Sequence, residues 1–430
     1  MKGFLERLVL IILASSLAMA CKAGGKVAGA DQLFGAIVRN DAQQVRLLIA
    51  QGAEVNCRDA NDVTPLALSA RLSRREISEL LLNSGADANI QSKMNDDIQD
   101  GGYTPLLWSI MNGGFETLQQ MLKKGGDVNR ASTEGDSPLI YAARGGFLDI
   151  VDLLLESGAN PDYKNPYTGR TALMEAVDSG KSAVVECLVD KGVDMGKRDE
   201  YGNTLFMLAA SGGQLAELMY LTELGKADLG AKNHSGDTAL HLAIGDYWTY
   251  LRAQDFLCTE GADVDAKNNW GTTPLMEAAS RGRPKTVGLL INRGAQVKAV
   301  DRAGNTPLHY AAKGFEDDRQ ISLSLINGGA DVNATNAEGN TPLIIACRNS
   351  YANIVSAVLM AKPEINMKNS QGWTALMEAA KAGNLAILQM LLESGADPNQ
   401  VNNDKETAAS ISKKFGRMKI HEYLSKERDK

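Results

Sequence analysis

A tripeptide of the form Thr-Pro-Leu or Thr-Ala-Leu returns along the chain at a nearly constant interval, and this regularity constrains the fold more than any other feature. The tripeptide and its variants begin at Thr64, Thr104, Ser137, Thr171, Thr204, Thr238, Thr273, Thr306, Thr341, Thr374 and Thr407. The first interval is 40 residues, and the nine others are 33 to 35 residues. Such a period predicts stacked copies of one small unit that cover each other and share no central core.

The residues around each tripeptide predict a short helix. The hydroxyl of Thr306 is suited to cap a helix, and Pro307 suits the first helical position, where its missing N–H is not needed. Leu308, Ala311 and Ala312 then share one face, and the alanines are small enough for close helix packing.

A second helix and a tight turn complete the unit. Residues 150–155 form an apolar run that Gly158 ends, as a left-handed residue after a helix does. Glycine stands two residues before the threonine in nine of the eleven units, where a tight turn needs positive φ. Asp62 and Lys405 are the two exceptions.

These features resemble the ankyrin-repeat family, whose signature is a 33-residue period with Thr-Pro-Leu-His-x-Ala. Gly-Ala-Asp-Val at 261–264 is another family mark, and the resemblance covers residues 31–428. It implies an all-α fold, an ankyrin-repeat solenoid of about 12 units in which helix-turn-helix repeats are joined by β-hairpin loops. We expect a capping repeat at 31–59, internal repeats over 60–402 and a second capping repeat at 403–430.

The two end repeats differ from the others as solenoid caps do. Residues 31–59 lack the tripeptide but keep a helix pair. Residues 403–428 keep Thr407, and they replace an apolar outer face with Lys413, Lys414, Arg417 and Lys419. Polar outer faces on end repeats keep a solenoid soluble.

The first 20 residues have the pattern of an export signal. Lys2 and Arg7 precede a largely apolar run over 8–20, which is too short to span a bilayer as a helix. We therefore expect 1–20 to be a signal peptide. No later stretch approaches 18 consecutive apolar residues.

Two interpretations of the cleavage site remain open. Ala18-Met19-Ala20 is an ordinary signal-peptidase site, in which case Cys21 is incidental. Alternatively, Leu17 to Cys21 resembles a bacterial lipobox with Cys21 as the lipidated residue, although Ala18 stands where that pattern has leucine. Residues 21–30 are rich in glycine and alanine and are expected to form a flexible tether.

The charge balance argues against nucleic-acid binding, and the motifs argue against catalysis. The 45 Lys and Arg residues are outnumbered by 52 Asp and Glu, which gives a formal net charge of −7 and no basic footprint. Gly180-Lys181-Ser182 has only the tail of a phosphate-binding loop. No nucleophile with a base, metal cluster or cofactor motif is found, so we expect no enzyme activity, no cofactor and no metal.

Histidine and cysteine are expected to be structural. His241 and His309 occupy the fourth place of the tripeptide motif, where the family resemblance implies a hydrogen bond between repeats. Cys57, Cys187, Cys258 and Cys347 fall in separate repeats, too far apart for disulfides. Cys187 and Cys347 replace packing residues, which predicts small buried side chains.

Aromatic residues at the hairpin tips are the candidate partner-binding site. In the family, residues that flank the turn glycine point outward, and here these places or places near them hold Tyr103, Tyr167, Tyr201, Trp270 and Trp373. Tyrosine and tryptophan are enriched at interface hot spots. The alternative is that each ring lies flat over the neighbouring tip.

Three glutamates and two insertions allow further interpretations. Glu175, Glu277 and Glu378 share one position on the first helices and form an acidic stripe, a solvated helix surface or ion pairs between repeats. Insertions near 92–97, at 247–250 and at 316–318 are either loop drift or contact sites.

The function expected from these features is that of a monomeric, non-enzymatic scaffold that binds a protein partner, exported to a bacterial envelope and anchored in the membrane by lipid on Cys21. One alternative is a periplasmic accessory, protective or immunity factor for an enzyme or toxin. Another is a surface-exposed binder of host proteins.

Overall fold

A computed structural model describes residues 29–59, 62–95, 100–244 and 248–428. Cys21, Tyr247 and residues 96–97, on which parts of the predictions above depend, lie outside the described residues. The chain divides into two compact units, one ending at Glu200 and the other beginning at Tyr201, and each is described by itself.

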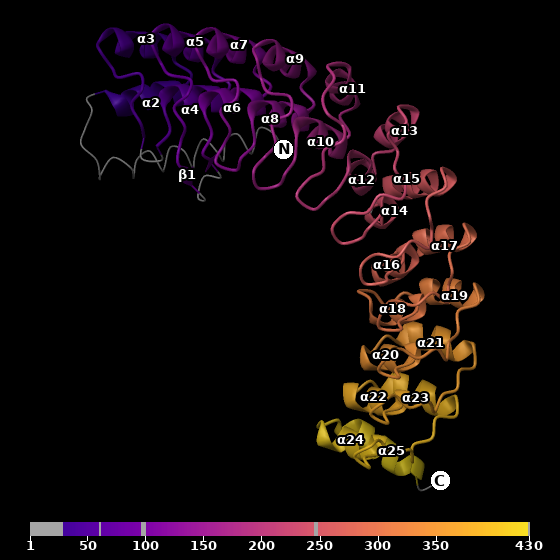
Figure 1. Cartoon of the computed structure of the whole chain (residues 1–430). Helices are drawn as coiled ribbons and strands as arrows, with labels where there is room; N and C mark the ends of the chain where they lie inside the picture. Colours follow the sequence, from indigo (N-terminus) through magenta and orange to yellow (C-terminus); the bar gives the residue numbers. More distant parts are fainter. Residues whose placement is uncertain (1–28, 60–61, 96–99, 245–247, 429–430) are drawn as a thin grey trace. The chain divides into compact units, whose positions relative to one another are not determined.

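The first unit is a stack of five helix pairs within the described residues, with the helices in two rows (Figure 1). The first helices of the pairs are α2 (Ala30–Val38), α4 (Pro65–Arg71), α6 (Pro105–Met111), α8 (Pro138–Gly145) and α10 (Ala172–Asp178). The second helices are α3 (Ala42–Ala50), α5 (Arg75–Asn83), α7 (Phe115–Lys123), α9 (Leu148–Glu156) and α11 (Ser182–Asp190).

The second unit repeats this arrangement in seven pairs, again counted over the described residues. Its first helices are α12 (Leu205–Ser211), α14 (Ala239–Leu242), α16 (Pro274–Ser280), α18 (Pro307–Lys313), α20 (Pro342–Arg348), α22 (Ala375–Ala382) and α24 (Ala408–Lys414). Its second helices are α13 (Leu215–Glu223), α15 (Trp248–Thr259), α17 (Pro284–Asn292), α19 (Arg319–Asn327), α21 (Ala352–Met360), α23 (Leu385–Glu393) and α25 (Met418–Arg428). The prediction of about 12 helical units is confirmed.

The predicted N-caps of the first helices and the turns before them form as the sequence indicates. Thr64 Oγ1 accepts a hydrogen bond from the N–H of Ala67, and the same bond recurs at the start of most first helices. The turn before each threonine takes positive φ even where glycine is missing, with φ 64° at Asp62 and 61° at Lys405. The geometry of the repeat therefore overrides the preference of these two side chains.

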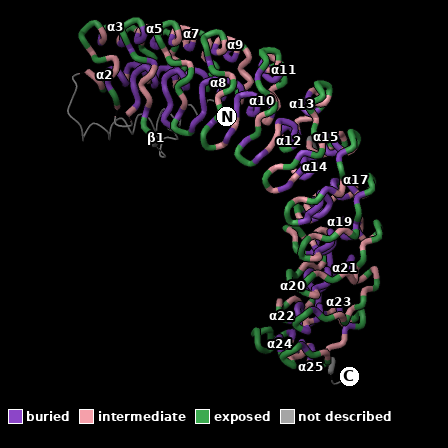
Figure 2. The backbone as a smooth tube through the Cα atoms, in the orientation of Figure 1, coloured by how far each residue is buried: buried purple, intermediate pink, exposed green. Residues whose placement is uncertain are grey.

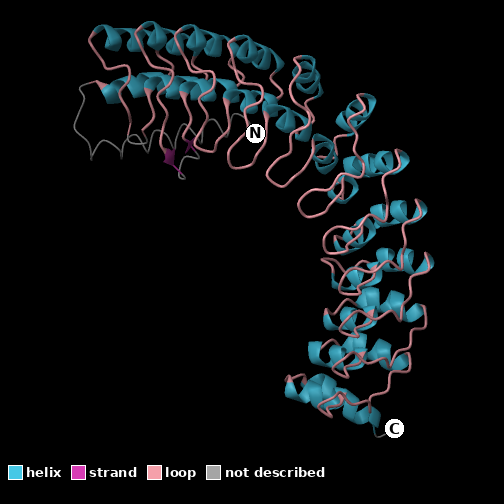
Figure 3. Ribbon diagram, viewed as in Figure 1, coloured by secondary structure: helices cyan, strands magenta, loops and turns pink. Residues whose placement is uncertain are grey.

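Loops join the helix pairs and project from the row of first helices (Figure 3). Among the described residues, the assigned strands are β1 (Met94–Asn95) and β2 (Asp100–Gly101), which pair antiparallel in the first unit. Figure 2 shows that burial repeats from pair to pair along each unit. Leu308, Ala311 and Ala312 are all buried, as the one-face pattern predicts.

The described residues of the insertions at 247–250 and 316–318, each in a 35-residue repeat, lie in different kinds of structure. Trp248 and Tyr250 do not lie in a loop, because α15 begins at Trp248. The loop at 316–318 does lie between α18 and α19, and Asp318 caps α19. Asp317 reaches the next repeat, where its carboxylate accepts from the N–H groups of Asn353 and Ile354 at 3.0 and 2.9 Å. This insertion therefore supplies the cap of α21.

Candidate functional site

The hairpin tip that carries Trp270 is held by hydrogen bonds between its backbone and the Asn268 side chain. Asn268 Oδ1 accepts from the N–H groups of Trp270 and Thr272, both at 3.0 Å, in the turn that asparagine favours. The N–H of Arg302, in the following tip, donates to the Trp270 carbonyl at 3.0 Å. The two tips are therefore linked, and the Trp270 side chain is 59% exposed.

A groove of about 650 Å³ lies beside these tips, within the second unit. Trp270 and Arg302 line it from the tips, while Glu277, Arg281 and Lys313 line it from the first helices α16 and α18 and the residue after α16. Preformed concave surfaces with a few placed polar groups are the usual binding sites of proteins. This groove is the candidate functional site.

The carboxylate of Asp301 in the groove accepts hydrogen bonds from neighbouring residues of the protein. It accepts from the Ala303 N–H at 2.8 Å, from the N–H and Nδ2 of Asn305 at 2.7 and 2.9 Å, and from the Tyr310 hydroxyl at 2.8 Å. Burial alone would raise the pKa of Asp301, but these hydrogen bonds outweigh it and hold the pKa below its ordinary value. Burial also raises the pKa of Tyr310 to about 12, so the phenol remains a donor.

The other charged groups of the groove are arranged around its aromatic surface. Arg281 Nε donates to Glu277 Oε1 at 2.6 Å, an exposed pair one helical turn apart. Lys313 Nζ lies 4.3 Å from the centre of the Tyr310 ring, a cation–π contact. Trp270 and Arg302 remain exposed at the rim. The groove thus offers tryptophan and arginine side chains, the residue types that dominate protein interfaces.

The five aromatic residues predicted to bind a partner fall into two groups. Tyr167, Tyr201 and Trp270 precede the turn glycine and are 63%, 61% and 59% exposed. Tyr103 and Trp373 follow the glycine directly; Tyr103 is only 7% exposed and Trp373 is half-buried. The expectation that residues on both sides of the glycine point outward is therefore wrong for Tyr103, and it holds only in part for Trp373.

Tyr103 belongs to a buried aromatic cluster of the first unit. Its ring meets Trp108 edge-on with centroids 5.0 Å apart, and it meets Tyr141 in the same way at 5.7 Å. Arg71 lies over the Trp108 ring at 5.0 Å. These contacts give Tyr103 a packing role between repeats.

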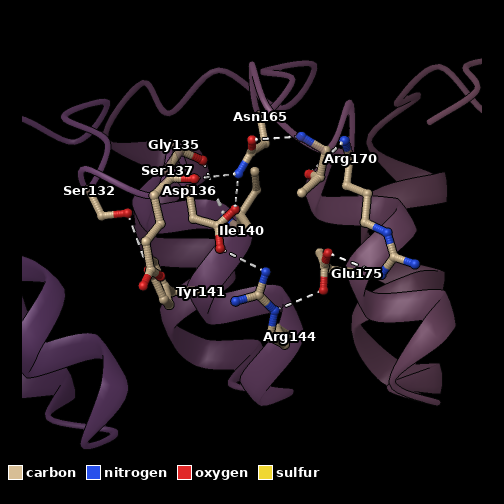
Figure 4. A network of polar contacts seen from close by, with 12 residues as sticks. Ser132, Gly135, Asp136, Ser137, Ile140, Tyr141, Arg144, Asn165, Arg170 and Glu175 are labelled. Carbon is tan, nitrogen blue, oxygen red and sulfur yellow. Dashed lines mark hydrogen bonds and ion pairs between the residues drawn. The ribbon is translucent and has the colours of Figure 1, made fainter. Parts of the chain in front are cut away.

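The glutamate at position 175 forms an ion pair between repeats (Figure 4). Arg144 of the preceding repeat donates to Glu175 at 2.8 Å and to Asp136 at 2.7 Å, and Arg170 approaches Glu175 at 3.3 Å. Burial alone would raise the pKa of Glu175, but Arg144 and then Arg170 outweigh it and hold the pKa below its ordinary value. Asn165 Nδ2 donates to Asp136 at 2.6 Å and extends the network.

Glu378 repeats this arrangement in the second unit. It is buried, and it accepts from Nε and Nη2 of Arg348 in the preceding repeat at 3.0 and 2.8 Å. Glu277, in contrast, pairs with Arg281 of its own repeat. The three glutamates therefore form no continuous acidic stripe, and for Glu175 and Glu378 the alternative of an inter-repeat ion pair is confirmed.

A recurrent contact escaped the sequence analysis. In several first helices, the last or next-to-last residue pairs with the residue before the capping threonine or serine, eight positions earlier. The hydrogen-bonded cases are Arg144 with Asp136, Arg170 with Asp178, Arg348 with Asn340, and Lys414 with Glu406. A search for complementary residues eight apart, in register with the tripeptide, would have found these pairs.

The two motif histidines join neighbouring repeats of the second unit. His309 Nδ1 accepts from the Thr306 N–H at 3.1 Å, so the proton lies on Nε2, which donates to the Asn340 carbonyl of the next repeat at 2.9 Å. His241 makes the same contacts with Thr238 at 3.2 Å and with the Thr272 carbonyl at 3.0 Å. The family's inter-repeat hydrogen bond is present at both positions.

These histidines predict a loss of stability at mildly acidic pH. Burial lowers the pKa of His241 and His309 below the ordinary value, so below about pH 6.5 the unfolded chain takes up protons that the folded unit does not. The unfolding free energy of the second unit should fall by up to about 1.4 kcal/mol per histidine and pH unit, until the folded pKa is reached. Urea unfolding at a series of pH values measures this slope, and the double variant His241→Gln/His309→Gln should flatten it.

The cysteines of the described residues are free thiols. Cys57 and Cys347 are buried, and burial raises the pKa of Cys57 to about 11. Cys187 is only half-buried, and its Sγ donates to Asp152 Oδ1 at 3.4 Å, so the prediction of a fully buried Cys187 is wrong. Gly180 and Lys181 lie in the turn between α10 and α11, and Ser182 is the first residue of α11.

The described residues contain neither a membrane-spanning helix nor a metal-binding cluster. None of the helices there combines the length and the apolar character needed to cross a bilayer. No group of three or more His, Cys, Asp or Glu side chains in that part of the chain is arranged to hold a metal ion.

Comparison with known families agrees with this geometry. A family model described as ankyrin repeats (3 copies) matches in overlapping segments that together run from residue 33 to residue 402. The chain therefore belongs to the ankyrin-repeat family. The ankyrin repeat is a non-enzymatic interaction fold.

Several curated proteins are similar to the chain over part of their length. The human transient receptor potential cation channel subfamily A member 1 is 25% identical over 292 residues, 65% of this chain and 25% of that protein. Ankyrin repeat and KH domain-containing protein mask-1 of Caenorhabditis elegans is 30% identical over 57% of this chain and 9% of that protein. The B-cell lymphoma 3 protein homolog of Mus musculus is 29% identical over 41% and 39%. The chain thus spans less than two fifths of each of these relatives.

Proposed function

We propose that this chain is a non-enzymatic scaffold that binds a protein partner through the groove of the second unit. The observation that carries this proposal is the groove itself, in which the exposed Trp270 and Arg302 stand on linked, hydrogen-bonded tips. A rigid tip loses little conformational freedom on binding. Burial of the Trp270 ring against a partner therefore costs little conformational entropy.

Replacing Trp270 with alanine is expected to weaken partner binding by about 30-fold, because a tryptophan anchor contributes roughly 2 kcal/mol or more. The partner is first captured from envelope extract with the wild-type chain and identified, and its affinity is then measured by titration. Tyr167→Ala is the matched control, since Tyr167 is equally exposed but lies in the first unit. Both variants should unfold within about 1 kcal/mol of the wild type.

Two results would remove the groove from the proposal. One is equal affinity of the wild type and Trp270→Ala for the identified partner. The other is a larger loss in Tyr167→Ala, which would move the site to the tips of the first unit. Trp373→Ala and Tyr201→Ala then test the remaining predicted tip residues.

The proposal includes export and a lipid anchor on Cys21. Its support is the order of the residues: Lys2 and Arg7, the apolar run 8–20, small residues at Ala18 and Ala20, and then Cys21 before a glycine-rich segment. Two or more acyl chains give stable membrane anchoring where one chain does not.

Palmitate labelling and detergent partitioning test the anchor. The wild type should incorporate label and enter the detergent phase, and Cys21→Ser should do neither. A soluble, unlabelled wild type contradicts the anchor and leaves simple cleavage after Ala20. Protease treatment of intact cells separates a periplasmic partner, such as an enzyme or toxin, from a host protein met at the cell surface.

A further inference from the structure

An exposed corner of the second unit combines cationic and apolar side chains. Residues 413–419 run from the end of α24 through a turn to the start of α25, and all seven are exposed. No longer uninterrupted exposed run occurs among the described residues. We call residues 413–419 the basic corner. Its cations are Lys413, Lys414, Arg417 and Lys419.

The apolar residues of the basic corner do not fit a purely solubilising cap. Phe415 is 44% exposed and Met418 is 53% exposed, although a polar outer face would place both inward. Lys381 of the preceding repeat, also exposed, lies 5.4 Å from the centre of the Phe415 ring and adds a fifth cation. Large apolar side chains among cations are a feature of surfaces that meet a partner.

The charge of the basic corner opposes that of the chain. The whole chain has a formal charge of −7, whereas four of these seven residues are cationic and none is acidic. Glu406 pairs with Lys414 at 2.6 Å, and Arg417 Nε donates to the Lys381 carbonyl at 3.1 Å. These contacts fix the positions of two cations and leave the local charge positive.

We propose that the basic corner binds the surface of an anionic phospholipid bilayer. Clusters of lysine and arginine are drawn to anionic headgroups, and exposed phenylalanine and methionine enter the boundary between headgroups and acyl chains. The corner is a turn between two helices in which all seven residues are exposed, so its side chains can meet a flat surface. This proposal does not depend on the groove or on lipid at Cys21.

Sedimentation with vesicles tests the proposal. The full chain carrying Cys21→Ser is mixed with vesicles of phosphatidylcholine alone, or of phosphatidylcholine and phosphatidylglycerol in equal amounts. The quadruple variant Lys413→Gln, Lys414→Gln, Arg417→Gln and Lys419→Gln should bind the anionic vesicles at least about 50-fold more weakly, since each cation contributes about fivefold. The apolar run at 8–20 contributes equally to all variants, so only differences between variants are interpreted.

A matched control separates the basic corner from net charge. Lys123→Gln, Lys124→Gln, Arg130→Gln and Lys298→Gln change the same number of exposed cations elsewhere, and their binding should stay within about twofold of the parent chain. Phe415→Ser with Met418→Ser should weaken binding at high salt, where the apolar part remains. Far-UV circular dichroism and thermal unfolding check that each variant is folded.

Three outcomes would overturn the proposal. The first is equal loss in the quadruple and control variants, which shows an effect of net charge alone. The second is equal binding of the quadruple variant and the parent to anionic vesicles. The third is binding of an oligonucleotide, or association of two copies of the chain, that needs the corner cations while vesicle binding does not.

Discussion

Replacing Glu175 with alanine is expected to lower the free energy of unfolding of the first unit by about 2 kcal/mol, because Arg144 and Arg170 lose a buried charged acceptor and keep only Asp136 and Asp178 as partners. Arg144 and Arg170 both direct guanidinium groups at this carboxylate, and each keeps part of its surface in solvent. That partial exposure and the two remaining carboxylates place the effect below the range for a buried charge left without any partner. Urea unfolding followed by circular dichroism measures it.

Glu277→Ala is the matched control for this prediction. Glu277 occupies the same repeat position, but its partner Arg281 lies one turn away on the surface, where such a pair contributes about 0.5 kcal/mol or less. Equal effects of the two substitutions would mean that the Glu175 network contributes no more than a surface pair.

Replacing His309 with alanine should destabilise the second unit by about 3 kcal/mol. The substitution leaves the Thr306 N–H and the Asn340 carbonyl without their partner in the core, and each unsatisfied buried group costs about 1–3 kcal/mol. It also leaves a cavity, because the imidazole is fully buried. Chemical unfolding at neutral pH provides the measurement.

His309→Met separates the two hydrogen bonds. Met276 holds the same place in the preceding repeat, where its Sδ accepts from the Thr273 N–H at 3.5 Å. Methionine at 309 can therefore fill the space and meet Thr306, but it has no proton to donate to Asn340. A loss of about 1 kcal/mol is expected. If the methionine and alanine variants lose equal free energy of unfolding, the bond to the next repeat carries the whole effect. If the alanine variant is as stable as the wild type, the bond between repeats is not a source of stability.

Local chemistry explains why so much of the fold could be predicted. The Thr64 cap, the proline after it and the turn before it act within a few residues, and at Asp62 the backbone keeps its conformation without glycine. The candidate site was predictable only in part, because Trp270 precedes its glycine and is exposed, whereas Tyr103 follows its own glycine, two places further along the repeat, and is buried.

Some contacts join neighbouring repeats, and the sequence did not identify both of their partners. Glu175 meets Arg144 across 31 residues, and Asp317 caps a helix 36 residues away. Two residues one repeat apart are paired only if their rotamers meet, and the tripeptide pattern carries no signal for that. Arg302 and Lys313 entered the candidate site for this reason only with the structure.

The hydrogen bonds of the motif histidines have a direction, and that direction sets where a shortened chain can end. His309 donates forward to the carbonyl of Asn340 in the next repeat. A chain cut just after the repeat of His309 would lose this carbonyl and leave the imidazole N–H without its acceptor. A repeat with methionine at that place, such as the one that contains Met377, makes no such forward donation. Protein engineers who trim or fuse this array should therefore place the last junction after a methionine repeat.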